Sequence, residues 1–139
     1  MSVEDLEKII EANFTSQIKI LHAFLKQAIK KERIDVVILG STNVYEAGAG
    51  TVVYGAAKAG ILGLVKALNK EYSETDIRFW LVSFGTLANE MGSKVPNQEY
   101  GSLLNVEMVA QEIFNKINHK GNFWQPEIVI RRRHIRTTS

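Results

Sequence analysis

Four polar residues stand at spacings that suit chemistry at a carbonyl group. Tyr54 and Lys58 lie four positions apart at the start of a predicted helix, so their side chains share one helix face. Ser41 lies thirteen residues before Tyr54, directly after an apolar run, and Asn13 lies on the apolar stripe of an earlier predicted helix. A phenol, an ammonium and a hydroxyl facing one pocket can assist hydride transfer to or from a C=O/CH–OH pair by moving the proton.

The ammonium is needed because a free phenol titrates near pH ~10, which is too high for a good acid at neutral pH. A nearby positive charge stabilises the phenolate, and a fall of about three pKa units corresponds to roughly 4 kcal/mol. One ammonium and a positively charged nicotinamide ring in a dry site can supply this amount. In this scheme Ser41 holds the substrate oxygen, and Asn13 holds a water that relays protons to Lys58.

The set resembles the active site of the short-chain dehydrogenase/reductase family. The family's Tyr-x-x-x-Lys motif matches Tyr54 and Lys58, its serine matches Ser41, and its helix asparagine matches Asn13. The resemblance implies an NAD(P)-dependent oxidoreductase that acts on a small carbonyl compound or secondary alcohol. It also implies that Tyr54 and Lys58 contact the cofactor, with Lys58 holding the nicotinamide ribose, and that the asparagine distorts its helix.

The resemblance covers residues 1–91 well and residues 103–130 loosely. Residues 54–68, rich in small side chains, are similar to the family's central helix, and residues 77–83 are similar to the strand that follows. In the family this helix and the one before it form a four-helix dimer interface, which we expect here too.

Departures from the family pattern concern the cofactor. The Thr-Gly-x-x-x-Gly-x-Gly turn that the family carries after its first strand has no counterpart in the 139 residues. The chain is thus expected to match the back half of the fold, with the pyrophosphate site and the choice between NAD and NADP left to residues before Met1. Further on, Phe84 and Gly85 stand where the family has Pro-Gly, and Asn89 replaces its threonine. Gly85, Thr86 and Asn89 are the expected contacts of the nicotinamide carboxamide.

The elements that must position these residues follow from hydrophobic periodicity. We expect helices over 3–32, 51–72 and 106–119, buried strands over 34–39 and 76–83, a short strand over 127–130, and an irregular segment over 92–102. Ser2 with Asp5 is a candidate N-cap. The order αβαβαβ predicts a single α/β domain over 1–139, with a partial Rossmann-like, doubly wound parallel sheet of about three strands flanked by helices.

Two features of this arrangement predict association. The strand over 34–39 would present an unpaired edge, so we expect a homo-oligomer or a partner chain to cover it. Gly55, Gly60 and Gly63 make the helix after Thr51 thin, which predicts close packing against a neighbouring helix or the sheet.

Composition excludes several classes of protein. The chain is 45% hydrophobic and 23% charged, and its net charge of +2 points to neither nucleic acid nor an anionic membrane. No apolar run reaches the ~18 residues of a membrane helix. The chain has no cysteine, and its three histidines share no metal-binding spacing, so no metal site is expected. An acidic N-terminus is unlike a signal peptide, which makes a cytoplasmic location the default.

Other interpretations stay open. Ser41 also suits a turn at the end of a strand, and Asn13 suits a structural hydrogen bond to a neighbouring backbone group. The basic run over 131–136 reads as a solvated tail, with phosphate or nucleic-acid contact as the alternative. Candidate pocket residues, chosen for their loop positions, are Glu46, Met91 and Tyr100, and residues 48–50 are expected in a substrate-side loop. The alternative function is a non-catalytic member of the family that acts in assembly through its helix interface.

Overall fold

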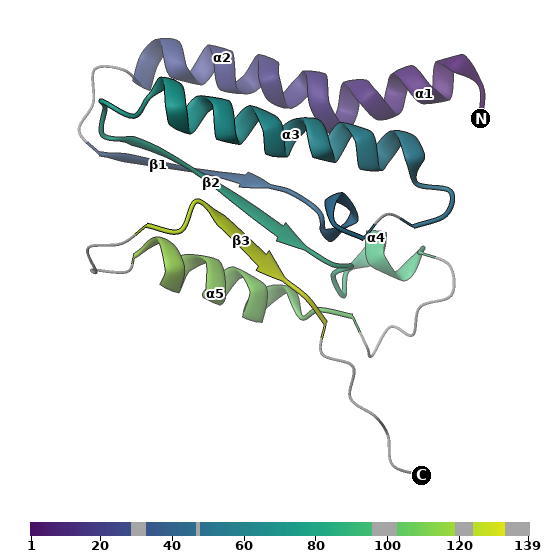
Figure 1. Cartoon of the computed structure of the whole chain (residues 1–139). Coiled ribbons are helices and arrows are strands. Elements are labelled where there is room, and N and C mark those ends of the chain that lie inside the picture. Colours follow the sequence, from purple (N-terminus) through teal and green to yellow (C-terminus); the bar gives the residue numbers. More distant parts are fainter. Residues whose placement is uncertain (29–32, 47, 96–102, 119–123, 133–139) are drawn as a thin grey trace.

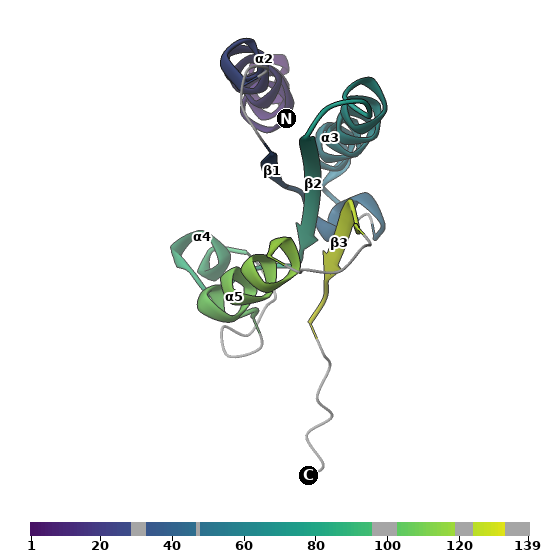
Figure 2. The same ribbon diagram turned by 90° about the vertical axis from the view of Figure 1, so that its left-hand side faces the viewer.

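The fold is known from a computed structural model, which describes residues 1–28, 33–46, 48–95, 103–118 and 124–132. Among these residues, the strands β1 (Ile34–Leu39), β2 (Ile77–Phe84) and β3 (Glu127–Ile130) form a parallel sheet in the order β1-β2-β3. Helices α2 (Ser16–Ala28) and α3 (Val52–Glu71) lie on one face, and α5 (Val106–Ile117) lies on the other (Figures 1 and 2). The predicted α/β class with parallel strands is confirmed.

The core divides into two layers because successive side chains of a strand point to opposite faces. Between the sheet and the helices α2 and α3, the buried cluster includes Leu25, Ile61, Val65, Phe79 and Leu81. On the face toward α5 the cluster comprises Trp80, Val82 and Ile128, with partly buried side chains of α5 packed against it. The central strand β2 is therefore apolar on both faces, which is why its sequence shows no alternation.

The N-terminal helix is not the regular helix that periodicity predicts. Helix α1 (Val3–Ile10) begins at a Ser2–Asp5 capping box, as expected, but a π-helical turn, η1 (Glu11–Thr15), separates it from α2. Within η1 the Asn13 Nδ2 donates to the Ile9 carbonyl at 3.0 Å, so a side chain binds a carbonyl of the preceding turn. Such bonds compete with the regular backbone ladder and loosen it. The predicted end of this helix lies outside the described residues.

The π-turn packs against α3 at a glycine. A Cβ added at Gly60 would lie 2.8 Å from the Phe14 ring, so only glycine admits the ring at this distance. A Cβ added at Gly63 meets no described atom within 4 Å, apart from its own helix backbone. The close packing predicted from the three glycines is thus confirmed at Gly60, whereas at Gly63 no described part of this chain provides it. At Gly55 the nearest contact is ordinary, with Asn43 Oδ1 at 3.4 Å.

Helix α3 corrects the expectation about membrane-length segments. Of the described helices, it is the one long and apolar enough to cross a bilayer by length and composition alone. Its apolar residues Ile61, Val65 and Leu68 are buried against β1 and β2, however. Packing in the core accounts for part of the apolar composition of α3, since 28% of this stretch is buried in the structure.

Two short helices follow the strands at their carboxyl ends. The 3₁₀ turn η2 (Thr42–Val44) follows β1, and α4 (Glu90–Ser93) follows β2. The sequence predicts an irregular segment from residue 92, but Asn89 caps α4 by accepting the Gly92 N–H at 2.7 Å. A single turn is too short to show helical periodicity, which explains the miss. Most of the predicted irregular segment, residues 96–102, lies outside the described part.

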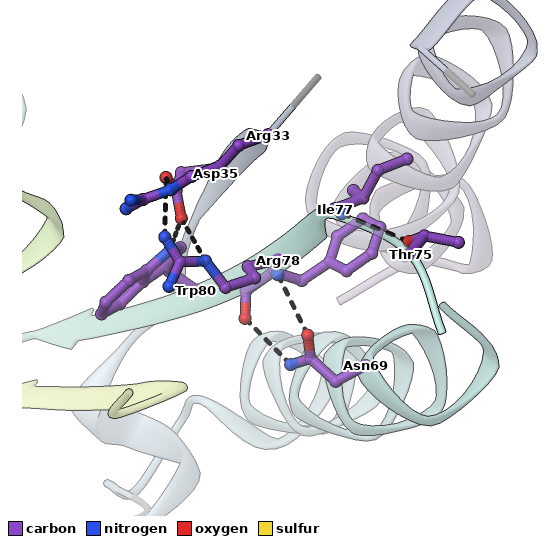
Figure 3. Close-up of polar contacts among 8 residues, drawn as sticks. Arg33, Asp35, Asn69, Thr75, Ile77, Arg78 and Trp80 are labelled. Atoms are coloured by element: carbon purple, nitrogen blue, oxygen red, sulfur yellow. Dashed lines mark hydrogen bonds and ion pairs between the residues drawn. The ribbon is translucent and has the colours of Figure 1, made fainter. Parts of the chain in front are cut away.

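Side chains complete the hydrogen bonding of β2 at its N-terminal end (Figure 3). The Leu81 N–H donates to the carbonyl of Pro126, the residue before β3. The backbone groups of Phe79, two residues earlier, point toward the same side of β2, but β3 does not extend far enough to pair with them. There Asn69 Nδ2 donates to the Phe79 carbonyl at 2.9 Å, and its Oδ1 accepts the Phe79 N–H at 3.0 Å. The Asn69 side chain of α3 thus makes the two hydrogen bonds to Phe79 that a neighbouring strand would otherwise make.

Candidate active site

A cavity of about 740 Å³ opens at the carboxyl ends of the strands. Its walls come from the segments that follow β1, β2 and β3 and from the first turn of α3. In parallel α/β sheets this edge is where ligands bind. Of the residues that the sequence singles out for chemistry or cofactor contact, the cavity brings together Ser41, Tyr54, Gly85, Thr86 and Asn89.

Ser41 serves as the N-cap of η2 and faces the cavity as well. Its Oγ accepts the Asn43 N–H at 3.2 Å, the bond expected of a turn residue at the end of a strand. Because this bond uses a lone pair, the hydroxyl hydrogen stays available for donation to an oxygen in the cavity. The structural and chemical interpretations of Ser41 are therefore compatible.

Asn43 is a site residue that sequence reasoning missed. It lines the cavity, its backbone N–H holds Ser41, and its side-chain Oδ1 accepts from Thr51 Oγ1 at 3.1 Å. Thr51 is the residue before α3, so Asn43 links the serine turn to the start of the helix that carries Tyr54. Its place two residues after Ser41, at a helix N-terminus, is the signal that points to it.

Tyr54 and Lys58 come from the first two turns of α3 and lie close to each other. Tyr54 is half-buried, and the Lys58 Nζ lies 5.7 Å from the centre of the Tyr54 ring. Lys58 is 9% exposed, and burial lowers the pKa of its ammonium. Lys58 is not among the described residues that line the cavity; it lies behind them, beside the Tyr54 ring.

Asn13 lies in η1 and is not among the described residues that line the cavity. Its Nδ2 donates to the Ile9 carbonyl, and its own carbonyl accepts from Gln17 Nε2 at 3.1 Å. The structural hydrogen bond considered for Asn13 is therefore present, in a helix that is distorted at this residue. A water relay from Asn13 to Lys58 stays a prediction.

The expected carboxamide contacts lie opposite Ser41, after β2. Gly85 presents bare backbone to the cavity, and Thr86 follows it. The Asn89 Oδ1 is engaged in capping α4, which leaves the Nδ2 hydrogens as its donors. A Cβ at Gly92 would lie 1.8 Å from the Leu87 carbonyl oxygen, so the turn from β2 into α4 closes only over a glycine.

The remaining residues of the cavity wall include the candidates that were chosen for their loop positions. Glu46 and Met91 line the cavity, as predicted, whereas Tyr100 lies outside the described residues. Arg131 and Arg132, the first residues of the predicted solvated tail, line it too, and Arg131 is also exposed to solvent; residues 133–136 lie outside the described part. The signal that sequence reasoning missed is that Arg131 follows the last residue of β3, which places it at the same sheet edge as Ser41.

Comparison with known proteins relates the sequence of this chain to reductases of one family. The chain is 27% identical over 126 residues to "Carbonyl reductase family member 4" of Xenopus laevis, covering 91% of this chain and 48% of that protein. It is 30% identical over 99 residues to the 3-oxoacyl-(acyl-carrier-protein) reductase FabG of Vibrio cholerae, covering 71% and 40%. The chain spans about half the length of the curated relatives it matches.

Solved structures share the fold. A short chain dehydrogenase from Escherichia coli CFT073 in complex with NADPH superposes with a TM-score of 0.80 at 15% identity, over 94% of this chain and 54% of that one. A short-chain dehydrogenase/reductase from Vibrio parahaemolyticus gives 0.78 at 22% identity, over 96% and 58%. The sequence model of the short chain dehydrogenase family matches residues 1–100. The chain belongs to the short-chain dehydrogenase/reductase family.

Proposed function

We propose that this chain carries the proton-transfer site of an NAD(P)-dependent oxidoreductase acting on a small carbonyl compound or secondary alcohol. The observation that carries the proposal is that Ser41 and Tyr54 line the same cavity, with the Lys58 Nζ 5.7 Å from the centre of the Tyr54 ring. The cofactor, when bound, supplies or accepts the hydride. The residues of this chain hold the substrate oxygen and move its proton.

Each residue has a separate role. The Tyr54 hydroxyl gives its proton to the carbonyl oxygen during reduction and takes it back during oxidation. Ser41 donates a hydrogen bond to the same oxygen. The Asn43 N–H, which donates to Ser41 Oγ, leaves the hydroxyl hydrogen free for this bond. The Lys58 ammonium favours the phenolate and donates to the nicotinamide ribose, and Asn13 supports a proton relay to Lys58.

The residues after β2 fit the nicotinamide end of NAD or NADP. Gly85 lets a flat ring approach the backbone, while the Thr86 hydroxyl and the Asn89 Nδ2 offer hydrogen bonds to the carboxamide. The pyrophosphate is bound in this family by a glycine-rich turn at a helix N-terminus. We propose that efficient turnover needs such a turn in addition to residues 1–139.

Single-turnover oxidation of NADPH tests the proposal. The 139-residue chain, given millimolar NADPH and butane-2,3-dione, is expected to oxidise NADPH slowly. Tyr54→Phe should lower the rate by about 10²–10⁴-fold, because it removes the acid. Tyr72→Phe is the matched control, since Tyr72 packs edge-on against Phe79 in the core. Equal rates for the Tyr54→Phe variant and wild type would sink the catalytic assignment.

The same assay decides between the two functions. At micromolar NADPH the chain alone should show no steady turnover, and a robust rate would contradict the need for a further phosphate-binding turn. If neither millimolar NADPH nor NADH supports any oxidation, and calorimetry detects no binding, the non-catalytic assembly role is favoured instead.

The pH dependence tests Lys58 separately. Burial lowers the pKa of Lys58, so it loses its charge at a lower pH than an exposed lysine does. The rate should fall as the pH rises through that pKa, because the neutral amine no longer favours the phenolate. Lys58→Arg stays charged at all accessible pH values, so it should move the fall to higher pH. An alkaline limb that is identical in both proteins would assign the fall in rate to a group other than the Lys58 ammonium.

We propose in addition that the chain self-associates or pairs with another chain in the cytoplasm. Support comes from β1, which is an edge strand of the described sheet, and from exposed apolar side chains on the helices above it, Val3, Ile20 and Val52. Light scattering of the purified chain tests this. A well-folded monomer at high concentration would be the contrary result.

A further inference from the structure

The cavity wall has an uneven charge. Among the described residues that line the cavity, the charged side chains are Glu46, Arg131 and Arg132. Two of these side chains are positive and one is negative. A cleft in which positive side chains outnumber negative ones favours anionic ligands over cationic ones.

Arg131 is held in place in a way that leaves most of its donors usable. Its Nε forms an ion pair with Glu46 Oε1 at 2.9 Å, and its guanidinium lies 5.8 Å from the centre of the Tyr45 ring. Tyr45 in turn donates its hydroxyl to the Glu127 carboxylate of β3. The bond to Glu46 occupies one of the five guanidinium N–H groups, and the side chain is 52% exposed.

A guanidinium fixed through Nε presents its terminal nitrogens as a planar fork. This fork matches the two oxygens of a carboxylate or phosphate, and Arg132 lines the same cavity beside it. Holding the side chain before a ligand arrives reduces the entropy lost on binding. The arrangement therefore suits an anion better than a neutral group.

The position of Arg131 separates this anion from the phosphates of the cofactor. β3 is the edge strand opposite β1, and two strand spacings of about 4.8 Å set them roughly 10 Å apart. In the proposed function the cofactor phosphates lie beyond β1, on the other side of Ser41 and Tyr54. An anion at Arg131 would thus belong to the substrate.

We propose that Arg131, with Arg132, binds an anionic group of the substrate, so that the chain acts on carbonyl compounds or alcohols that carry a carboxylate or phosphate. This inference rests on the proposed function, which supplies the carbonyl end at Ser41 and Tyr54. It assigns the Arg131 side chain as a determinant of substrate specificity.

Binding to the 139-residue chain tests it with three ligands that share one carbonyl end: 4-oxopentanoate, its methyl ester and 4-oxopentyl phosphate. Calorimetry at low salt should give at least one anionic ligand about tenfold or more tighter binding than the ester. Arg131→Gln should remove most of that preference and leave the affinity for the ester unchanged. Lys66→Gln, the same charge change on an exposed residue of α3, should preserve the preference. Comparing the two anions shows whether carboxylate or phosphate is preferred.

Glu46→Gln provides a second test that does not depend on the folding of the arginine variant. Glutamine at 46 can still accept from Arg131 Nε through its amide oxygen, but it removes the negative charge that repels an anion, so this substitution should tighten binding of the preferred anion severalfold. Equal affinities of acid, phosphate and ester in wild type would overturn the inference, as would Arg131→Gln or Glu46→Gln variants that bind the anions like wild type.

Ser41→Ala separates this inference from the proposed function. If the carbonyl end binds as proposed, Ser41→Ala should weaken all three ligands by a similar factor, with the anion preference retained. A preference that depends on Arg131 together with no effect of Ser41→Ala would support an anion site and reject the carbonyl site. The reverse pattern would keep the proposed function and reject the anionic substrate.

Discussion

Asp35→Asn is the substitution whose effect the structure specifies most closely. The Asp35 carboxylate, 16% exposed, accepts from Trp80 Nε1 at 2.8 Å and pairs with Arg78 Nε at 3.0 Å and Arg33 Nε at 3.1 Å (Figure 3). Burial by itself would raise the pKa of Asp35. The hydrogen bonds from Trp80 and Arg78 and the two guanidinium charges outweigh burial and lower it. One carboxylate thus ties β1 to the side chains of β2.

The cost of the substitution follows from the partners that asparagine loses. Its oxygen can still accept from the Trp80 indole, but its NH₂ group turns a donor toward a guanidinium. Loss of the charge-assisted bond to Arg78 costs about 1.5–3 kcal/mol. The pair with Arg33 adds about 1 kcal/mol at most, since the Arg33 side chain is 57% exposed. The free energy of unfolding should fall by about 1.5–4 kcal/mol near neutral pH.

The pH dependence gives the sharper result. Because the folded-state pKa of Asp35 lies below its unfolded value, the unfolded chain binds more protons between the two, and stability rises with pH there. The contribution is fully present above the unfolded pKa of about 3.9 and is lost as the pH falls through the folded pKa. Urea unfolding should show a gap between wild type and Asp35→Asn that is wide at neutral pH and narrows in acid. Asp76→Asn, an exposed carboxylate, is the control. A gap that does not change with pH would refute the reasoning.

Urea unfolding also checks three substitutions that concern packing and backbone satisfaction. Gly60→Ala gains up to about 1 kcal/mol of helix propensity but crowds the Phe14 ring at a cost of about 1–3 kcal/mol, so a net loss is expected. Gly63→Ala meets no such contact and should raise the free energy of unfolding by about 0.5–1 kcal/mol. If both substitutions raised it, or both lowered it, the packing of η1 on α3 would be contradicted. Asn69→Ala should cost about 2–4 kcal/mol, because two backbone groups of the fully buried Phe79 lose their partners, and a loss below 1 kcal/mol would show that water replaces them.

The strands and the long helices could be predicted from the sequence because local patterns decide them. β1 occupies the predicted residues, and β2 differs from its prediction by one residue at each end. Both are nearly continuous apolar runs, and a buried parallel strand needs no other signal. The placement of Ser41 and Tyr54 at one sheet edge follows from parallel order alone.

The remaining features depend on contacts that no local pattern contains. The π-turn at Asn13 arises where a side chain competes with the backbone hydrogen bonds of the helix. The apolar periodicity of the sequence continues through this turn, so it gives no sign of the distortion. The place of Arg131 depends on β3 pairing beside β2 and on a loop residue, Glu46, eighty-five positions earlier in the chain. Asn43, Asn89 and Arg131, whose places in the site sequence reasoning missed or gave only in part, share this dependence on tertiary contacts.

Ser41 and Asn89 join two kinds of role, and this bears on how loss of activity is to be interpreted. Each caps a short helix while lining the cavity, so Ser41→Ala also removes the side-chain cap of η2. A lost cap costs about 1 kcal/mol. A domain of about 5 kcal/mol stability would keep a folded-to-unfolded ratio near 10³ after that loss, so the folded fraction would hardly change. A hundredfold fall in rate corresponds to about 2.7 kcal/mol in the transition state. A fall of that size in Ser41→Ala, with the unfolding midpoint only slightly lowered, could not come from the lost cap and would have to come from the hydrogen bond to the substrate oxygen.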